Sequence, residues 1–228
     1  TPCGTLFPYT TLFRSRFRSK RLRDFRRSRK KIEKDFNSPM EIKIFQKDTE
    51  IEKLCNDSEM VSKKTYHRKL GFGFQYDKYK DEYQHIFNLK AKNNSLCGIV
   101  AYIDNTPSAF WIFTIYKGVG YGDWTGYDPA LNKYSIGTLS LIEAIRYFCS
   151  ENIKKIDFGA GEAFYKERFG GEEFDEAGVM FFPKTIKGVF QRIIYNFFDW
   201  INIEIKFLLE SIGFLNSVKK HSRYKKVK

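Results

Sequence analysis

Two glycine-containing segments in the second half of the chain combine residue types that bind phosphate and move protons. The first is a polar turn of five residues that leads directly into a strongly amphipathic pattern: Tyr134, Ser135, Ile136, Gly137 and Thr138. The first turn of a helix leaves backbone N–H groups unpaired and carries the positive end of the helix dipole, so it attracts phosphate. Gly137 would let a ligand approach the backbone closely. We therefore expect a phosphate-binding turn here. A role for Ser135 as a simple helix N-cap is the alternative.

The second segment follows a buried strand pattern and contains Asp157, Gly159 and Gly161, with Tyr165 and Lys166 shortly after. Two glycines after a strand indicate a backbone that stays narrow, either for a ligand or for a tight turn. Tyr165 offers a phenolic proton and Lys166 a cation. Asp157 could also bind only local backbone N–H groups. The segment lacks the glycine spacing of dinucleotide-binding sites, so nothing here supports nucleotide redox chemistry.

The elements that must position these segments form a mixed α/β pattern. We expect helices over residues 16–36, 48–68, 79–92, 136–150 and 162–169, and strands over residues 41–46, 96–103, 108–116, 119–125, 153–158 and 177–182. Three antiparallel strands followed by a β-α-β crossover predict a mixed, mostly antiparallel sheet with helices on both faces.

The composition narrows the function classes. With 42% hydrophobic residues in 228, the chain can bury a substantial core, which excludes wholesale disorder. The four cysteines lie far apart, without a CxxC pair or a neighbouring histidine: Cys3, Cys55, Cys97 and Cys149. This spacing excludes the usual zinc sites and a dense disulfide framework, and it fits a reducing compartment. We expect no metal.

The net charge of +13 is concentrated at the two ends of the chain. Residues 14–34 contain twelve basic and two acidic residues, and residues 219–228 contain six basic and no acidic ones. The remainder is slightly acidic, whereas a nucleic-acid-binding protein would usually carry the charge on a folded face. The basic helix is interpreted either as a solvated helix that packs through one stripe or as a surface for an anionic partner such as a membrane.

Residues 186–215 are rich in apolar side chains, but charged residues interrupt them too often for a membrane span. The pattern predicts one amphipathic helix, or a helical pair that breaks near Asp199. Packing in the core and an interfacial helix beside the basic tail are the two interpretations.

Residues 5–15 read TLFPYTTLFRS, which resembles the in-frame translation of a common short-read sequencing adapter. We therefore leave residues 1–15 out of the fold prediction, as for an expression scar. We expect the chain to be a C-terminal fragment that folds only in part and has little activity.

From residue 16 to 182 the chain resembles the C-terminal half of bacterial GNAT-superfamily acyltransferases of cellulose and exopolysaccharide biosynthesis. The matching stretches are KTYHRKLGFGF at 64–74, TPSAFW at 106–111, TGYDPALNKYSIGTLSLIEAI at 125–145 and KIDFGAGEAFYKERFG at 155–170. The turn at residues 132–138 departs from the general GNAT phosphate loop, because it keeps one glycine and lacks the leading Arg or Gln.

The resemblance implies a GNAT fold and acyl transfer from a thioester, with the donor pyrophosphate at the turn containing Gly137. It implies Tyr165 as the acid, Asp123 as the base and Lys166 as a screen for donor phosphate. Acceptor contacts are implied at Tyr127, Asp128, Asp157, Gly159 and Gly161. The expected domains are a linker helix at 16–38, the acyltransferase domain at 39–183 and a helical extension at 184–228.

The predicted function is acyl transfer from acetyl-CoA or another acyl-CoA to an amine or hydroxyl of a cell-envelope or polysaccharide precursor. The predicted location is the cytoplasm, with a peripheral contact at the inner face of the membrane. One alternative is a Fem-like transferase that takes its acyl group from aminoacyl-tRNA. Another is an inactive module that binds an anionic partner through residues 16–34.

Overall fold

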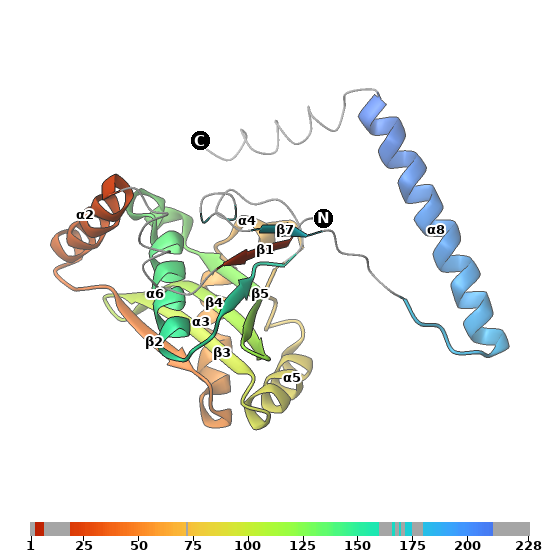
Figure 1. Ribbon diagram of the computed structural model, residues 1–228, viewed down its shortest axis with the longest axis horizontal. Coiled ribbons are helices and arrows are strands. Elements are labelled where there is room, and N and C mark those ends of the chain that lie inside the picture. Colours follow the sequence, from red (N-terminus) through yellow and green to blue (C-terminus); the bar gives the residue numbers. More distant parts are fainter. Residues whose placement is uncertain are drawn as a thin grey trace. The chain divides into compact units, whose positions relative to one another are not determined.

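A computed structural model of the chain describes residues 3–6, 19–71, 73–159, 166, 169, 172–174 and 180–211. The chain divides into two compact units, residues 1–176 and residues 177–228. Figure 1 shows the first unit as a sheet with helices on both faces and the second as a long helix.

The sheet has the strand order β2-β3-β4-β5-β6-β1-β7. Its strands are β2 (Glu41–Phe45), β3 (Leu96–Ile103), β4 (Thr106–Tyr116), β5 (Val119–Tyr127), β6 (Lys155–Asp157), β1 (Cys3–Leu6) and β7 (Glu172–Phe174). Neighbours from β2 to β5 are antiparallel, while β5 and β6 are parallel. The expected mixed, mostly antiparallel α/β fold is therefore confirmed.

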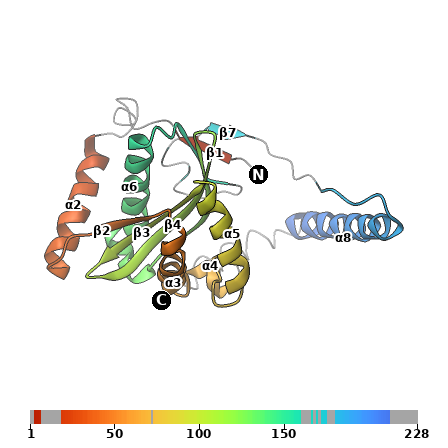
Figure 2. The same cartoon turned by 90° about the horizontal axis from the view of Figure 1, so that it is seen from below.

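Helices α2 (Ser19–Phe36) and α6 (Ile136–Ser150) lie on one face of the sheet, and Figure 2 shows them side by side. Helix α6 has the predicted bounds, and the four apolar residues at helical spacing are all buried: Leu139, Ile142, Ile145 and Phe148. They pack against the inward side chains of β3 and β4, including Trp111 and Phe113. Since this stripe faces the sheet, it fixes where the N-terminus of α6 lies.

The opposite face carries α3 (Ile51–Ser62), α4 (Tyr66–Lys69) and α5 (Lys80–Lys92), with the short 3₁₀ helix η1 (Asp48–Glu50) before α3. Its core is rich in aromatic rings, and Phe74 contacts Tyr83 and Phe87. The ring of Trp124 on β5 packs edge-on against all three.

The single helix expected over residues 48–68 is wrong, because the structure breaks it after Ser62. The Ser62 hydroxyl donates to the carbonyl of Phe74 at 2.6 Å, and the Thr65 hydroxyl donates to the carbonyl of Ser62 at 2.7 Å. Thr65 then caps α4 by accepting from the N–H of Arg68. These polar contacts replace a further helical turn.

Two expectations at the far side of the sheet also need correction. Strand β6 covers three residues rather than the six expected at 153–158. The last strand is β7 rather than residues 177–182, of which 180–182 are described and are not in a strand. Of the helix expected at 162–169, only Lys166 and Phe169 are described, both in helical conformation.

Residues 1–15 were left out of the fold prediction, whereas the structure places Cys3–Leu6 in the sheet as β1. This strand pairs antiparallel with both β6 and β7. A strand edge presents unpaired N–H and C=O groups to any extended segment, which gives such a short peptide a place in a sheet.

The second unit contains α8 (Ile186–Ser211), one helix that continues through Asp199 without the break considered above. Within the described residues, every helix is too short or too polar to cross a membrane.

Candidate active site

The site lies where the parallel strands β5 and β6 stop pairing. Only Val119, Gly120 and Tyr121 of β5 pair with β6, opposite residues 155–157, and β5 then continues for six residues to Tyr127. Among the described strands, none pairs with residues 122–127 on the side of β6. This stretch therefore has a strand edge whose backbone N–H and C=O groups can bind an extended ligand.

A bulge in β5 sits at the start of that free edge. The register with β4 passes from Ile112 opposite Trp124 to Phe113 opposite Gly122, so Asp123 is the extra residue. A bulge leaves its extra residue without a ladder partner and redirects its side chain. The Oδ2 atom of Asp123 accepts from Nζ of Lys90 on α5 at 2.8 Å and from Oγ1 of Thr114 on β4 at 2.6 Å.

The free edge leads through the 3₁₀ helix η2 (Pro129–Tyr134) to a left-handed residue, Ser135. Ser135 has φ 55° and ψ 39° and is the N-cap of α6, without a side-chain capping hydrogen bond. A right-handed residue followed by a left-handed one gathers successive N–H groups into an anion-binding concavity. The N–H of Ser135 is used by the carbonyl of Asn132 at 2.9 Å. The N–H groups of Ile136 and Gly137 follow in the first turn, where a helix supplies no acceptor.

The side chain of Tyr134 is buried and anchors this turn to the core, so only its backbone can face a ligand. It is 2% exposed, and its hydroxyl donates to Asp35 of α2 at 2.7 Å. The amino groups of Lys31 and Lys133 lie 5.6 and 4.8 Å from the centre of its ring. A hydrogen bond with the Tyr134 side chain is the main reason that the pKa of Lys133 is raised. Two cations therefore flank the turn.

Gly137 faces an aromatic ring rather than open space. A Cβ atom added there would lie 3.0 Å from Cδ1 of Tyr127, the last residue of β5, whose side chain is 41% exposed. The structure thus brings Tyr127 together with the turn at 134–138. The proximity of this ring is sufficient to explain the small residue at position 137.

Asp128 ties the end of β5 to the segment after α3. Its carboxylate accepts from Lys64 Nζ at 2.7 Å and from the N–H of Ala130 at 3.0 Å, which caps η2. A Cβ on Gly126 would lie 3.0 Å from the Thr65 methyl carbon. Residues 64 and 65 therefore line the same end of the strand as Tyr127 and Asp128.

The second predicted segment follows β6. The carboxylate of Asp157 accepts from the N–H of Gly159 at 2.7 Å, the local capping role left open by the sequence. Gly159 has φ 69°, a conformation that favours glycine, and its carbonyl accepts from Lys166 Nζ. Gly161 and Tyr165 lie outside the described residues. Because Asp157 pairs with Tyr121, six residues before Tyr127, Asp157 lies about 20 Å along the strand from Tyr127.

The sequence alone missed several polar partners of the site. Lys64 begins the matching stretch at 64–74 but was given no role, and Lys90 and Thr114 lie outside the matching stretches; each of the three contacts a residue more than eight positions away. Lys and Asp residues are frequent along the chain, so the sequence alone does not show which lysine contacts which aspartate. Among the described side chains, no group of three His, Cys, Asp or Glu residues could hold a metal ion.

A family model described as an acetyltransferase (GNAT) domain matches residues 19–167, which is well over half of the chain. No curated protein matches the chain in sequence.

Solved structures show the same fold at low identity. The C-terminal domain of a protein described as a lysylphosphatidylglycerol synthetase from Agrobacterium fabrum has a TM-score of 0.50 and 10% identity, covering 75% of this chain. This chain spans only 57% of that domain. A protein described as an acetyltransferase from Clostridium acetobutylicum, solved with acetyl-CoA, has a TM-score of 0.46 and 20% identity, with 62% of this chain and 95% of that chain covered. A GCN5-related N-acetyltransferase from Ralstonia eutropha has a TM-score of 0.47 and 17% identity, with 62% and 98% covered.

Proposed function

Since the chain belongs to the GNAT acetyltransferase domain family, we propose that it transfers an acyl group from acyl-CoA to an amine or hydroxyl. The observation that supports this best is the continuity of the free edge of β5 with the left-handed turn at Ser135. The edge suits the amide groups of a pantetheine arm, which can pair with it as an added strand. The turn suits the pyrophosphate, through the N–H groups of Ile136 and Gly137.

Bound acyl-CoA would supply an acyl group activated as a thioester, and the chain's own residues would handle the protons. In this proposal Tyr165 protonates the departing thiolate and Asp123 takes the proton of the acceptor. Asp123 faces Lys90 and Thr114, so it must exchange one of these partners for the acceptor. Lys166 would screen donor phosphate; its amino group also holds the Gly159 carbonyl, which gives it a second, structural task.

The acceptor we propose is a cell-envelope or polysaccharide precursor, met in the cytoplasm at the inner face of the membrane. The stretches at 125–145 and 155–170 support it through their resemblance to exopolysaccharide acyltransferases. Tyr127 and Asp128 would contact this acceptor, because a half-exposed ring beside a carboxylate suits a sugar's apolar face and hydroxyl groups. The Lys64–Asp128 ion pair would set the position of that carboxylate.

The donor proposal is tested at Ser135, where one position offers a matched pair of variants. Ser135→Val places a β-branched residue at positive φ, at a cost of about 1–2 kcal/mol, and should shift the turn. We expect roughly tenfold weaker acetyl-CoA binding by isothermal titration. Ser135→Gly adopts the same backbone without strain and should bind acetyl-CoA as well as the original chain. Equal affinity in both variants would remove the pyrophosphate from this turn.

Gly137 gives a second test of the same turn. Gly137→Asp brings a negative charge toward the phosphate position and should abolish donor binding. Gly137→Ala is the control, because its methyl group also presses on the Tyr127 ring but adds no charge. If both variants lose the donor equally, packing against Tyr127 is the cause and the phosphate assignment fails.

The proton-transfer roles are tested by turnover rather than by binding. Tyr165→Phe and Asp123→Asn should lower kcat while leaving acetyl-CoA affinity nearly intact, and Lys166→Ala should weaken donor binding by about one to two decades. An unchanged kcat in Tyr165→Phe would remove it as the acid.

The alternative donor, aminoacyl-tRNA, is favoured by the basic surface of α2 beside Tyr134. It predicts tRNA binding that falls steeply with salt and no stabilisation by acetyl-CoA. Thermal shifts with acetyl-CoA, compared with tRNA binding at two salt concentrations, separate the two donors.

A further inference from the structure

Helix α8 carries an apolar face that is too wide for an ordinary surface helix. At 100° per residue its apolar side chains occupy an arc of roughly 220°, interrupted by Lys187, Glu204 and the final residue Ser211. A helix that packs through one stripe needs an arc of little more than 100°. The arc is rich in aromatic residues, namely Phe190, Phe197, Phe198, Trp200 and Phe207. Their side chains are between 55% and 71% exposed.

The remaining arc of α8 is polar but not cationic. It carries Gln191, Arg192, Asp199 and Asn202, all exposed. Over the whole helix the three basic residues are balanced by three acidic ones. Attraction to an anionic surface must therefore come from elsewhere in the chain, while α8 itself supplies apolar area and aromatic side chains.

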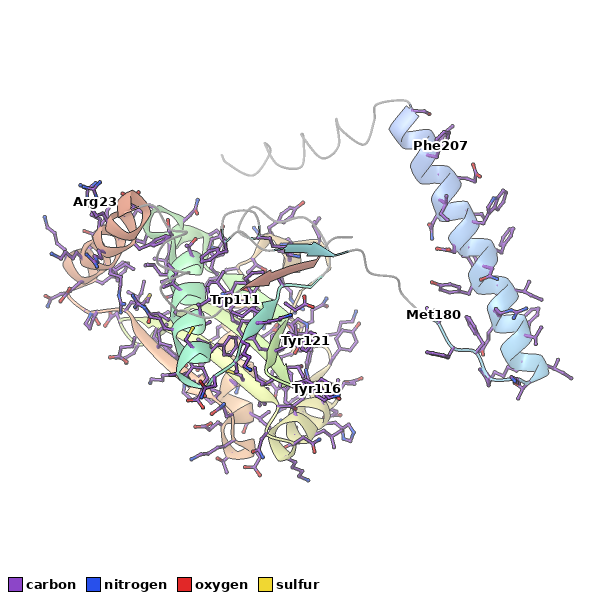
Figure 3. The ribbon with its side chains drawn as sticks, viewed as in Figure 1. Arg23, Trp111, Tyr116, Tyr121, Met180 and Phe207 are labelled. Carbon is purple, nitrogen blue, oxygen red and sulfur yellow. The ribbon has the colours of Figure 1, made fainter. Side chains whose placement is uncertain are left out.

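Helix α2 supplies that charge. Its apolar residues Phe25 and Ile32 are buried against the sheet, and Arg29 pairs with Glu143 of α6 at 2.7 Å. The opposite side is a continuous cationic face, and Figure 3 shows Arg23 extending from it, away from α6. This face consists of Arg23, Arg26, Arg27, Lys30 and Lys34, all exposed within an arc of roughly 100°.

Ion pairing does not neutralise this face. Among the described side chains, only Arg27 of the five has an ion pair, with Asp24 at 3.9 Å. A helix face on which four of five cations have no ion pair among the described side chains, and which carries no apolar side chain, can bind an anionic surface but cannot insert into it.

We propose that the chain binds the surface of an anionic lipid bilayer through two separate elements. The apolar arc of α8 lies in the boundary between headgroups and acyl chains, and the cationic face of α2 contacts the headgroups. Stable peripheral binding generally requires two such signals, one apolar and one electrostatic. This partner deepens the proposed function, since it would hold the acyl-transfer site beside envelope precursors.

A lipid surface fits α8 better than a second copy of the helix does. Pairing of two helices covers a narrow seam on each, which would leave much of a 220° arc in water. A bilayer interface covers the whole arc at once, and Trp and Phe are the side chains that interfacial helices place there.

The experiment is vesicle flotation with the full chain, comparing phosphatidylcholine vesicles with vesicles that also contain phosphatidylglycerol. Trp200 and Asn202 lie on opposite sides of α8, so Trp200→Glu and Asn202→Glu are a matched pair with the same change of charge. We expect Trp200→Glu to weaken binding to the anionic vesicles by about tenfold or more, and Asn202→Glu by less than about threefold. Arg26→Ser combined with Lys30→Ser should weaken binding by about tenfold and reduce its salt dependence.

Three results would overturn the proposal. They are no binding of the original chain to anionic vesicles, equal binding by the two α8 variants, and a lipid-free dimer that Trp200→Glu converts to a monomer. Salt-dependent binding of tRNA without vesicle binding would likewise assign the α2 face to nucleic acid. Acetyl-CoA titration of the same variants should be unchanged, so failure of the lipid proposal and failure of the acyl-CoA proposal are seen separately.

Discussion

The two faces of the sheet differ in the polarity of the side chains buried beneath their helices. Under α6 the buried side chains are almost entirely apolar, and Phe148 meets Phe113 edge-on with ring centres 4.8 Å apart. Under α3 and α5 the core contains buried charges as well as aromatic rings. Glu59 accepts from the N–H of Tyr76 at 2.8 Å and from Arg68 at 3.1 Å. Asp57 accepts from the Tyr102 hydroxyl.

This difference in buried polarity corresponds to the kind of element that packs on each face. The apolar face holds α6, a regular helix whose first turn belongs to the proposed donor site. The polar face holds the segment between α3 and α5, where the chain outside α4 is irregular in its described residues, and this segment brings Lys64 and Thr65 to the end of β5. An irregular segment leaves backbone groups without helix or strand partners, so buried polar side chains must satisfy them.

The largest expected effect comes from emptying the apolar face. Phe148→Ala removes a ring that is 1% exposed and should lower the free energy of unfolding by about 3–5 kcal/mol. Urea denaturation measures it. The exposed residue Glu151 in the next turn provides the control, because Glu151→Ala should cost less than about 0.5 kcal/mol. Similar losses in both variants would contradict a packed apolar face.

On the polar face the expected loss is somewhat smaller and depends on charge. Arg68→Met leaves the buried Glu59 carboxylate without its guanidinium partner and should cost about 3 kcal/mol. Lys63 approaches Glu59 and Asp77 at 3.8 and 3.4 Å, but its side chain is 55% exposed. Lys63→Met should therefore cost less than about 1 kcal/mol in the same urea denaturation. If Lys63→Met lowered the free energy of unfolding as much as Arg68→Met does, the burial of the Arg68–Glu59 pair would not matter to stability.

The polar face should also make stability depend on pH, with two opposite contributions. Burial raises the pKa of Glu59 above its usual value of 4.5, so the folded state holds a proton that the unfolded state releases. This contribution is lost as the pH rises from 4.5 through the raised pKa. A hydrogen bond from Arg68 lowers the pKa of Asp77 below 3.8, and that contribution is lost as the pH falls through the lowered pKa.

Glu59→Gln isolates the first contribution. Relative to the original chain, this variant should gain stability as the pH rises from about 4 to about 7, measured by denaturation at each pH. Relative to the original chain, Asp77→Asn should lose stability as the pH rises from the lowered pKa of Asp77 to about 5, and should change little from about 5 to about 7. A Glu59→Gln difference that does not change with pH would mean that the carboxyl titrates as it does in the unfolded chain.

The smallest effect concerns the reactivity of the thiols. A buried cysteine lies on each face of the sheet, so alkylation reports on both faces without a mutation. Burial raises the pKa of Cys97 under α6 and of Cys55 under α3 to about 12, so near pH 8 roughly one thiol in ten thousand is ionised. Cys149 is half-buried. Among these three thiols, alkylation followed by mass spectrometry should label Cys149 first. Equally rapid labelling of Cys97 would indicate that the apolar face opens readily.

The same contrast explains how far the sequence could predict the structure. Helix α6 and the strands β3 to β5 follow apolar periodicity, which is a local signal, and the predicted bounds of α6 were confirmed. The break after Ser62 depends on a hydrogen bond to Phe74, twelve residues later. The orientation of Asp123 depends on a bulge and on Lys90, 33 residues earlier. Such long-range polar contacts leave no periodic pattern.

The turn proposed as the donor site could be located from the sequence, but its backbone geometry could not. The turn at 134–138 follows from a polar, glycine-containing segment before a strong helix. The contact between Gly137 and Tyr127 needed the fold, because the two residues belong to different elements, α6 and β5, and no periodic pattern links them. The roles of Tyr165 and Asp123 stay predictions.

The left-handed backbone of Ser135 has a consequence for how phosphate loops are recognised by pattern. A sequence motif specifies glycine at a position where the loop requires a left-handed backbone conformation. In the turn that we propose as the phosphate site, serine adopts that conformation at a modest energetic cost, and asparagine or aspartate could do the same. A pattern written as dihedral angles would accept this chain, whereas a glycine-based expression rejects it. Proteins that a letter-based filter discards as lacking the loop are therefore worth re-reading for an αL residue just before their strongest helix.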